Sequence, residues 1–200
     1  QIQKELKKES VLNTPLHELE AIVFDLETTG FYPDKGDKIL SFGAVKVKGE
    51  RIIEEESYYS LVQSDQPLSE DIKELTGITE EQLMAAPTIE TVLARFFEFV
   101  QGKPLVAHHA SHEKAFMQHA SWHILNTNFV HRVIDTSFLI KITSTQEELI
   151  TLDHCCQYFN IPISGRHHAL EDAKMTAQLW TKNVEQVMQL GFHSLQEVYV

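Results

Sequence analysis

Two acidic side chains, Asp25 and Glu27, stand two positions apart at the end of the apolar segment 21–24. On a β-strand, residues i and i+2 face the same side of the sheet, so both carboxylates project together. Two carboxylates held this close raise each other's pKa unless a cation neutralises them. Because Thr28, Thr29 and Gly30 follow as a turn, the pair favours a site for a hard divalent cation over a solvated strand end.

A third acid, Asp172, lies near the start of a predicted long helix and follows the histidines His167 and His168. A histidine beside a metal-binding carboxylate has the chemistry of a general base that activates water. Each residue also has a purely structural interpretation: a carboxylate favoured by the helix dipole, and histidines at a helix start. Helical spacing alone favours His168 as the partner of Asp172, because residues i and i+4 share a helix face.

A fourth acid, Glu113, falls on the first or second turn of another predicted helix, just after His108, His109 and His112. It can point toward the edge of the sheet, or it can be an ordinary first-turn acid. Nine of the eleven histidines lie between positions 108 and 168. That clustering marks the region in which a metal or proton-transfer site is to be sought. Acids from three distant segments meet only if the fold brings these strand and helix ends together.

The hydrophobic pattern predicts the elements that must position these acids. Alternating, β-branched segments predict strands at residues 21–27, 39–47, 52–62, 104–108 and 130–134, the second and third joined as a hairpin near Gly49. Helical spacing predicts helices at residues 68–75, 80–86, 89–100, 111–125, 152–159 and 168 to about 190, with Ser69 and Thr79 as N-caps of the first two. This order predicts an α/β fold with a mixed five-stranded sheet, an antiparallel meander followed by parallel strands, flanked by helices.

Length and composition bound the class of protein. With 200 residues, 42% of them hydrophobic, the chain is globular. Residues 1–19 are predicted to be a helical arm or linker, and residues 20–200 the functional domain. No apolar segment approaches the ~20 residues of a membrane span, and the charged N-terminus has no signal peptide. These features, with adjacent Cys155 and Cys156 that are unsuited to a mutual bridge, favour a cytoplasmic protein without a membrane partner.

The charge balance restricts how the chain can bind nucleic acid. Seventeen basic residues against 29 acidic residues give a net charge of −12. This excludes a protein that holds nucleic acid by a broad basic face. It is compatible with an enzyme that binds a short stretch of nucleic acid through metal ions.

Three segments of the chain resemble the motifs of the DnaQ-like (DEDDh) superfamily of 3′→5′ exonucleases. Residues 24–30, Phe-Asp-Leu-Glu-Thr-Thr-Gly, resemble the first motif, and residues 167–173 resemble the third, His-x-Ala-x-x-Asp-Ala. Residues 108–116 occupy the position of the second motif, usually His-Asn-Ala-x-Phe-Asp-x-x-Phe. The resemblance covers roughly residues 20–185 and implies a ribonuclease H-like fold.

The resemblance also implies a site. Its metal ligands are Asp25, Glu27, Glu113 and Asp172, which would hold two divalent ions, Mg²⁺ or Mn²⁺; Glu27 also serves in catalysis. Its general base is His167, because the family pattern places the histidine five residues before the last acid. The second motif departs from the pattern in three places: His109 replaces Asn, His112 replaces Phe, and Glu113 replaces Asp. Glu113 therefore carries its carboxylate one methylene further from the backbone than the usual ligand does.

The activity implied is hydrolysis of phosphodiester bonds at a single-stranded or frayed 3′ end of DNA, releasing nucleoside monophosphates, in replication proofreading or repair. Predicted substrate-binding residues are Thr28, Thr29, Phe31 and His108, with Lys114, Arg132 and Arg166 as further candidates. A DNA polymerase subunit is the expected partner. Two alternatives remain open: an RNA-trimming exoribonuclease of the same superfamily, and a non-catalytic module that binds nucleic-acid ends. The Glu-Thr-Thr-Gly sequence is closer to the proofreading group than to oligoribonucleases, which favours DNA.

Overall fold

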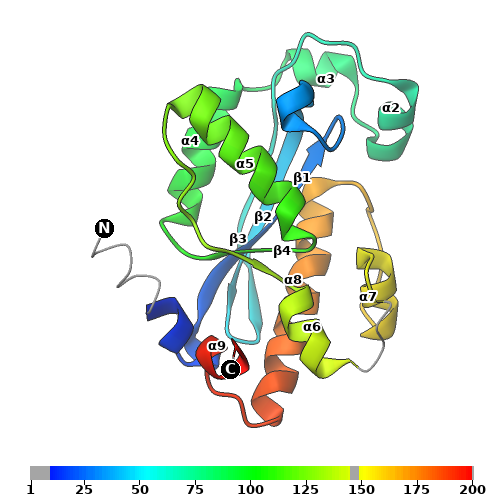
Figure 1. The fold of residues 1–200 in the computed structure, drawn as a ribbon. Helices are drawn as coiled ribbons and strands as arrows, with labels where there is room; N and C mark the ends of the chain where they lie inside the picture. The colour runs from blue at the N-terminus through cyan, green and yellow to red at the C-terminus, as the bar shows by residue number, and fades with distance from the viewer. Residues whose placement is uncertain (1–9, 145–148, 200) are drawn as a thin grey trace.

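The protein, described here by a computed structural model over residues 10–144 and 149–199, is built on one five-stranded sheet of order β3-β2-β1-β4-β5 (Figure 1). The strands β1 (Glu20–Thr28), β2 (Ile39–Lys48) and β3 (Arg51–Leu61) form an antiparallel meander. The short strands β4 (Leu105–Ala107) and β5 (Val133–Asp135) continue the sheet in parallel. The predicted mixed α/β sheet is confirmed.

Helices cover both faces of the sheet, as Figure 1 shows. On one face, α4 (Ile89–Val100) and α5 (Ala110–Leu125) pack against alternate residues of β1, among them Ile22 and Phe24. On the other face, α8 (Ala169–Gln189) packs against the intervening residues Ala21 and Val23. Since side chains alternate along a strand, Asp25 and Glu27 belong to the α8 face of β1. Asp25 and Glu27 therefore lie on the same face of the sheet as α8, the helix that carries Asp172.

A glycine lets α8 begin directly against the sheet. Gly43 pairs with Asp25 across β1 and β2. A Cβ atom at Gly43 would lie 2.2 Å from the backbone carbonyl carbon of Ala169, the first residue of α8. The missing side chain therefore permits a close helix–strand approach beside Asp25, which brings the start of α8 to the acidic strand end.

Most predicted elements are confirmed. The helix α4 has the predicted bounds, and α2 (Glu70–Thr76) and α3 (Glu80–Met84) begin after the N-caps Ser69 and Thr79. The helices α5, α7 (Leu152–Tyr158) and α8 begin within one residue of their predicted starts. Strand β5 begins three residues later than predicted. Four short elements were not predicted: η1 (Leu16–Glu18), η2 (Pro33–Lys35), α6 (Ser137–Thr143) and α9 (Leu195–Tyr199).

The described part of the N-terminal segment packs on the domain. Leu16 and Leu19 are buried in the same cluster as Leu195 and Val198, and the Leu16 N–H donates to the His193 carbonyl at 2.8 Å. The predicted helical arm falls largely on residues 1–9, outside the described residues, and the division at residue 19 stays a prediction. Cys155 and Cys156 are buried free thiols. Within residues 10–144 and 149–199, no helix combines the length and apolar character needed to cross a membrane.

Candidate metal-dependent active site

The end of β1 concentrates negative charge in a largely buried region. Glu27 is 8% exposed, and Oδ2 of Asp25 is buried without a hydrogen-bond partner. Burial, followed by the charges of Glu27 and Asp172, raises the pKa of Asp25 well above its usual value. Burial and the charge of Asp172 raise the pKa of Glu27 to about 8. The folded protein therefore pays a free-energy penalty to hold both carboxylates ionised, which a bound cation would relieve.

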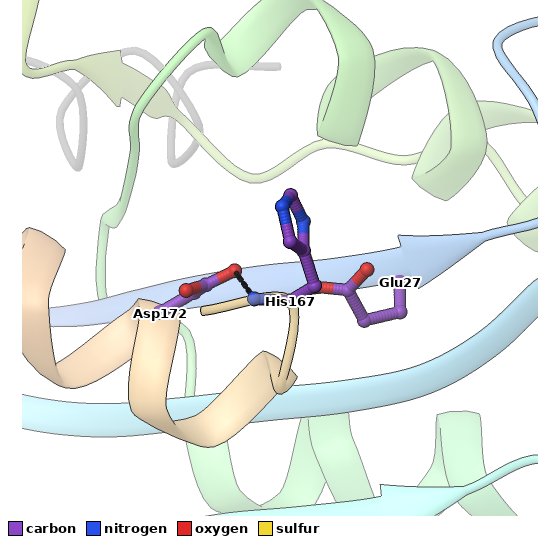
Figure 2. Close-up of side chains that lie close together, drawn as sticks. All are labelled: Glu27, His167 and Asp172. Carbon is purple, nitrogen blue, oxygen red and sulfur yellow. Dashed lines mark hydrogen bonds between the residues drawn. The ribbon is translucent and has the colours of Figure 1, made fainter. Parts of the chain in front are cut away.

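The first turn of α8 adds a third carboxylate to the same place. Asp172 is 3% exposed; its Oδ2 accepts the backbone N–H of His167 at 3.1 Å and lies 2.7 Å from Nη1 of Arg166. Its Oδ1 is buried and has no partner. Glu27, His167 and Asp172 each offer one ligand atom, and these atoms lie within 4.8 Å of one another (Figure 2). Two carboxylates and an imidazole from opposite ends of the chain thus share one site.

Glu113 approaches this site from the first turn of α5. It is 3% exposed, and its Oε2 is buried without a partner. Burial and then the charge of Asp25 raise the pKa of Glu113 well above its usual value, which identifies Asp25 as its acidic neighbour. The structure therefore brings all four predicted acids together, although Glu113 comes from a helix on the opposite face of the sheet.

The donor atoms fit a divalent cation. Asp25, Glu113 and Asp172 each carry a buried oxygen without a hydrogen-bond partner, and unsatisfied buried oxygens of this kind require an explanation. A cluster of carboxylate oxygens suits hard ions such as Mg²⁺ and Mn²⁺. The residues present are therefore those that such an ion needs.

The two adjacent histidines have different surroundings. The backbone of His167 is left-handed, with φ of 65°, and Figure 2 shows its ring beside Glu27 and Asp172. His168 is the N-cap of α8: its Nδ1 accepts the Glu171 N–H at 3.5 Å, and its ring stacks on Tyr59 with centroids 4.4 Å apart. His167, rather than His168, lies with the acids, in the position that the family pattern indicates.

Three of the predicted substrate-binding residues lie at the end of β1 and in the turn that follows: Thr28 is the last residue of the strand, and Thr29 and Phe31 lie in the turn. The Thr28 hydroxyl donates to the Gly30 carbonyl at 2.8 Å and lies 3.3 Å from Nε2 of His112. Phe31 is 76% exposed and contacts the His112 ring edge-on at 5.8 Å. Thr29 instead donates its hydroxyl to Asp37 at 3.2 Å. One polar and aromatic surface is therefore formed by Thr28, Phe31 and His112. The Thr29 side chain instead stabilises the turn through its hydrogen bond to Asp37.

The fourth, His108, is engaged by the protein on both ring nitrogens. Its Nδ1 lies 2.6 Å from the Thr136 hydroxyl and its Nε2 lies 2.6 Å from the Ile150 carbonyl oxygen. The structure places it beneath the lead-in to α7, linking that segment to β4. It does not bring a free ring nitrogen of His108 to the acidic site.

The sequence did not reveal the ion-pair partners of Arg166. Arg166 pairs with Asp172 and, through Nε at 2.6 Å, with Asp153 on α7. Asp172 is six positions and Asp153 thirteen positions from Arg166, and the two acids lie on different helices, so no local spacing rule connects all three residues. His112 stood out in the sequence as a departure from the family pattern that could add a ligand or a contact to a base, but its contacts with Thr28 and Phe31 became visible only in the fold.

Comparisons with known proteins identify the family of the chain. A family model described as an exonuclease (RNase_T) matches residues 22–180. A PolC-type DNA polymerase III of Caldanaerobacter subterraneus subsp. tengcongensis is 35% identical over 179 residues, covering 90% of this chain and 12% of that protein. A DNA polymerase III subunit epsilon-like protein of Rhodobacter capsulatus is 33% identical over 175 residues, covering 86% of this chain and 25% of that protein. The chain thus spans a small part of these relatives.

Solved structures share the fold. The nuclease domain of 3′hExo, a DEDDh family member bound to rAMP, superposes with a TM-score of 0.72 at 18% identity, covering 85% of this chain and 94% of that one. Exonuclease X in complex with 5′-overhanging duplex DNA gives a TM-score of 0.67 at 21% identity, covering 90% and 98%. The expected ribonuclease H-like fold is confirmed by such neighbours. On the strength of the family match over residues 22–180, the chain belongs to the RNase_T family of exonucleases, and the solved structures that share its fold include a DEDDh nuclease.

Proposed function

We propose that this domain removes nucleotides one at a time from the 3′ end of single-stranded or frayed DNA, with two divalent ions, in proofreading or repair. The observation that carries the proposal is the convergence of unpartnered carboxylate oxygens of Asp25, Glu113 and Asp172 in a site that also holds Glu27 and His167. The polymerase names of the sequence relatives support DNA as the substrate.

In the proposed reaction, the four acids bind the metal ions and His167 accepts a proton. Asp25, Glu27, Glu113 and Asp172 would hold Mg²⁺ or Mn²⁺, which when bound acidify a water and neutralise charge on the phosphodiester. The neutral imidazole of His167 accepts the proton of the attacking water as the new P–O bond forms. The bond to the 3′-oxygen of the penultimate nucleotide then breaks, and that oxygen acquires a proton. A nucleoside 5′-monophosphate and a shortened strand result.

The turn after β1 would hold the terminal nucleotide. The ring of Phe31 is exposed, and Thr28, which directly follows Glu27 in the chain, has its hydroxyl beside His112. A base can stack on such a ring without regard to sequence, at a gain of ~1–3 kcal/mol. Recognition by stacking and metal ions suits a chain with net charge −12, because it needs no broad basic face.

A pair of end-labelled substrates tests the reaction. With Mg²⁺ or Mn²⁺, a 3′-labelled oligonucleotide should release labelled mononucleotide at once, and a 5′-labelled one should give a ladder shortened from its 3′ end. Asp25→Asn and Asp172→Asn should abolish both. Glu98→Gln, an acid-to-amide change at an exposed residue of α4, is the matched control. Undiminished hydrolysis by either active-site variant would overturn the proposal.

The two alternatives are decided by parallel measurements. Matched short DNA and RNA oligomers distinguish a proofreading-type nuclease from an exoribonuclease of the same family, and we expect faster hydrolysis of DNA. Calorimetry with Mn²⁺ distinguishes an enzyme from a non-catalytic end-binding module, and we expect two bound ions rather than none. A DNA polymerase as partner and a cytoplasmic location are part of the same proposal.

A further inference from the structure

The side chain of Arg166 bridges two helices at the edge of the acidic site. Its Nη1 lies 2.7 Å from Oδ2 of Asp172 on α8, and its Nε lies 2.6 Å from Oδ1 of Asp153 on α7. The arginine side chain is 24% exposed and that of Asp172 is 4% exposed. Charge-assisted hydrogen bonds of this length are strong and directional, particularly when partly buried.

The two oxygens of Asp172 have distinct environments. Oδ2 is satisfied twice by this loop, once by the guanidinium of Arg166 and once by the backbone N–H of His167. Oδ1 is buried and has no partner. A carboxylate held by two donors on one oxygen cannot rotate freely about its last bond. Its other oxygen is therefore presented in a fixed direction.

We infer that Arg166 is a positioning residue for the metal site: it holds Oδ2 of Asp172, leaves Oδ1 for the ion, and is itself anchored by Asp153. The inference rests on the proposed function, because it assumes that Asp172 binds a divalent ion. Partners that orient metal ligands in this way are worth about 10–100-fold in metal affinity. The role assigned here requires no direct contact between Arg166 and the metal or the substrate.

A competing role makes the opposite prediction. Arg166 is a cation that pairs with Asp172 and whose charge acts on Asp25 and Glu27, so it could merely stand in for the metal ion and be displaced by it. Removing a stand-in cation would relieve repulsion and make metal binding tighter. Removing a positioning residue makes metal binding weaker, because Asp172 loses its orientation and the loop that carries His167 loses an anchor. The sign of the change in metal affinity separates the two roles.

The experiment measures the Kd for Mn²⁺ by calorimetry, without substrate. Arg166→Gln should raise the Kd about 10–100-fold. Arg166→Lys should restore only part of the affinity, since a lysine cannot match the guanidinium fork that serves both carboxylates. Arg51→Gln, at an exposed residue of the β2–β3 hairpin, should leave the Kd unchanged and is the matched control.

Asp153→Asn provides an independent test that leaves both Arg166 and Asp172 in place. It should raise the Kd in the same direction but less, and adding it to Arg166→Gln should have no further effect, because Asp153 acts through Arg166. Thermal unfolding of each variant verifies that it is folded. In single-turnover and steady-state assays, kcat should fall while KM for the oligonucleotide stays within about twofold.

The outcomes are distinguishable. If the wild-type protein binds no Mn²⁺, the proposed function fails and the inference falls with it. If the wild type binds Mn²⁺ but folded Arg166→Gln binds it equally well or more tightly, the proposed function stands and the inference is overturned. If the effects of Asp153→Asn and Arg166→Gln on the Kd for Mn²⁺ are fully additive, Asp153 does not act through Arg166 and that part of the inference is overturned.

Discussion

The glutamate at position 113 places a longer acidic side chain where the family pattern has aspartate. It starts from the first turn of α5 and reaches Asp25, and one of its carboxylate oxygens ends buried without a partner. Glu113 belongs with the other acids, even though the family pattern has aspartate there.

Shortening this side chain should impair the enzyme. Glu113→Asp withdraws the carboxylate from Asp25 by one methylene, and a misplacement of about 1 Å costs roughly 100-fold in rate. Glu113→Gln keeps the length but removes the charge, and should cost at least as much. Both are measured as kcat on a 3′-labelled oligonucleotide with Mn²⁺. A faster Glu113→Asp enzyme would mean that glutamate is the poorer ligand in this backbone.

Substitutions of the two adjacent histidines should have different effects on kcat. His167→Ala removes the proposed base and should lower kcat by about 10²–10⁴-fold, with two Mn²⁺ ions still bound in calorimetry. His168→Ala removes the N-cap of α8 and the stacking contact with Tyr59, so it should lower the unfolding temperature and change kcat much less. The reverse ranking of the two rates would assign the base to His168.

At the scale of single residues, the sequence predicted those residues that are related by local spacing or by a family motif. Asp25 and Glu27 follow from strand alternation. His167 follows from the family pattern, whereas helical spacing alone favoured His168. The pairing of Arg166 with Asp153 did not follow, because it depends on how α7 packs beside α8. The engagement of His108 by Thr136 and Ile150 was hidden for the same reason, since these partners are 28 and 42 residues away.

At the scale of elements, the site depends on the close approach of α8 to β2. Gly43→Ala would place a Cβ atom 2.2–2.4 Å from backbone atoms of Ala169 and Leu170, which cannot yield as a flexible side chain would. The start of α8 must shift away from the sheet and take Asp172 with it. We expect a loss of about 1–3 kcal/mol in the free energy of unfolding, typical of overpacking, and a higher Kd for Mn²⁺.

A second glycine supplies the control for this change. Gly102→Ala introduces a Cβ that meets nothing within 4 Å, although its φ of +74° is unfavourable for alanine. It should therefore lower stability by about 1–2 kcal/mol and leave the Kd for Mn²⁺ unchanged. If Gly43→Ala and Gly102→Ala affect metal binding alike, the close approach at Gly43 does not position Asp172.

Elements with strong local features were predicted from sequence, and those held only by tertiary contacts were not. The helix α4 shows regular apolar spacing and a Thr88 cap, and its bounds were predicted without error. The helix α6 has only seven residues, and it is fixed by the Asp135 side chain, which accepts the Ser137 N–H, and by burial of Leu139 and Ile140. The Asp135–Ser137 contact is local, two residues apart, but the burial of Leu139 and Ile140 depends on packing that no sequence window shows.

A departure from the family pattern also has a structural reason at this scale. His109, which stands where asparagine is usual, is the N-cap of α5 and has a left-handed backbone with φ of 56°. Asparagine and histidine are both enriched several-fold among non-glycine residues in this conformation. The position thus favours residues that tolerate a left-handed backbone, and no ligand role for His109 is needed to explain the replacement of asparagine by histidine.

For the whole molecule, the acidic site ties folding stability to pH and to divalent ions. The pKa of Glu27 is raised from 4.5 to about 8, so between these values the folded metal-free protein binds more protons than the unfolded chain. Stability must then fall as pH rises through that window. Asp25 and Glu113, whose pKa values are also raised, act in the same direction.

Histidines oppose this trend at lower pH. Burial lowers the pKa of His108 and His112 from 6.5, so their contribution to stability rises with pH up to about that value. Above about pH 7 these groups are neutral in both states and their effect is complete. The interval from about pH 7 to 8 therefore reports mainly on the acidic site.

Thermal unfolding of the metal-free protein should give a Tm that falls from about pH 7 to pH 8, as Glu27 loses its proton without a partner. Glu27→Gln should flatten this dependence, because the amide does not titrate. Mg²⁺ should raise the Tm more at about pH 8 than at pH 6, since ions bind the deprotonated carboxylates and not their protonated forms. A wild-type Tm that stays level over this interval in EDTA, or equal stabilisation by Mg²⁺ at both pH values, would show that the carboxylates are not held protonated in the absence of metal. The net charge of −12 cannot produce the same result, because Glu27→Gln changes it by one unit only and leaves the remaining surface charges in place.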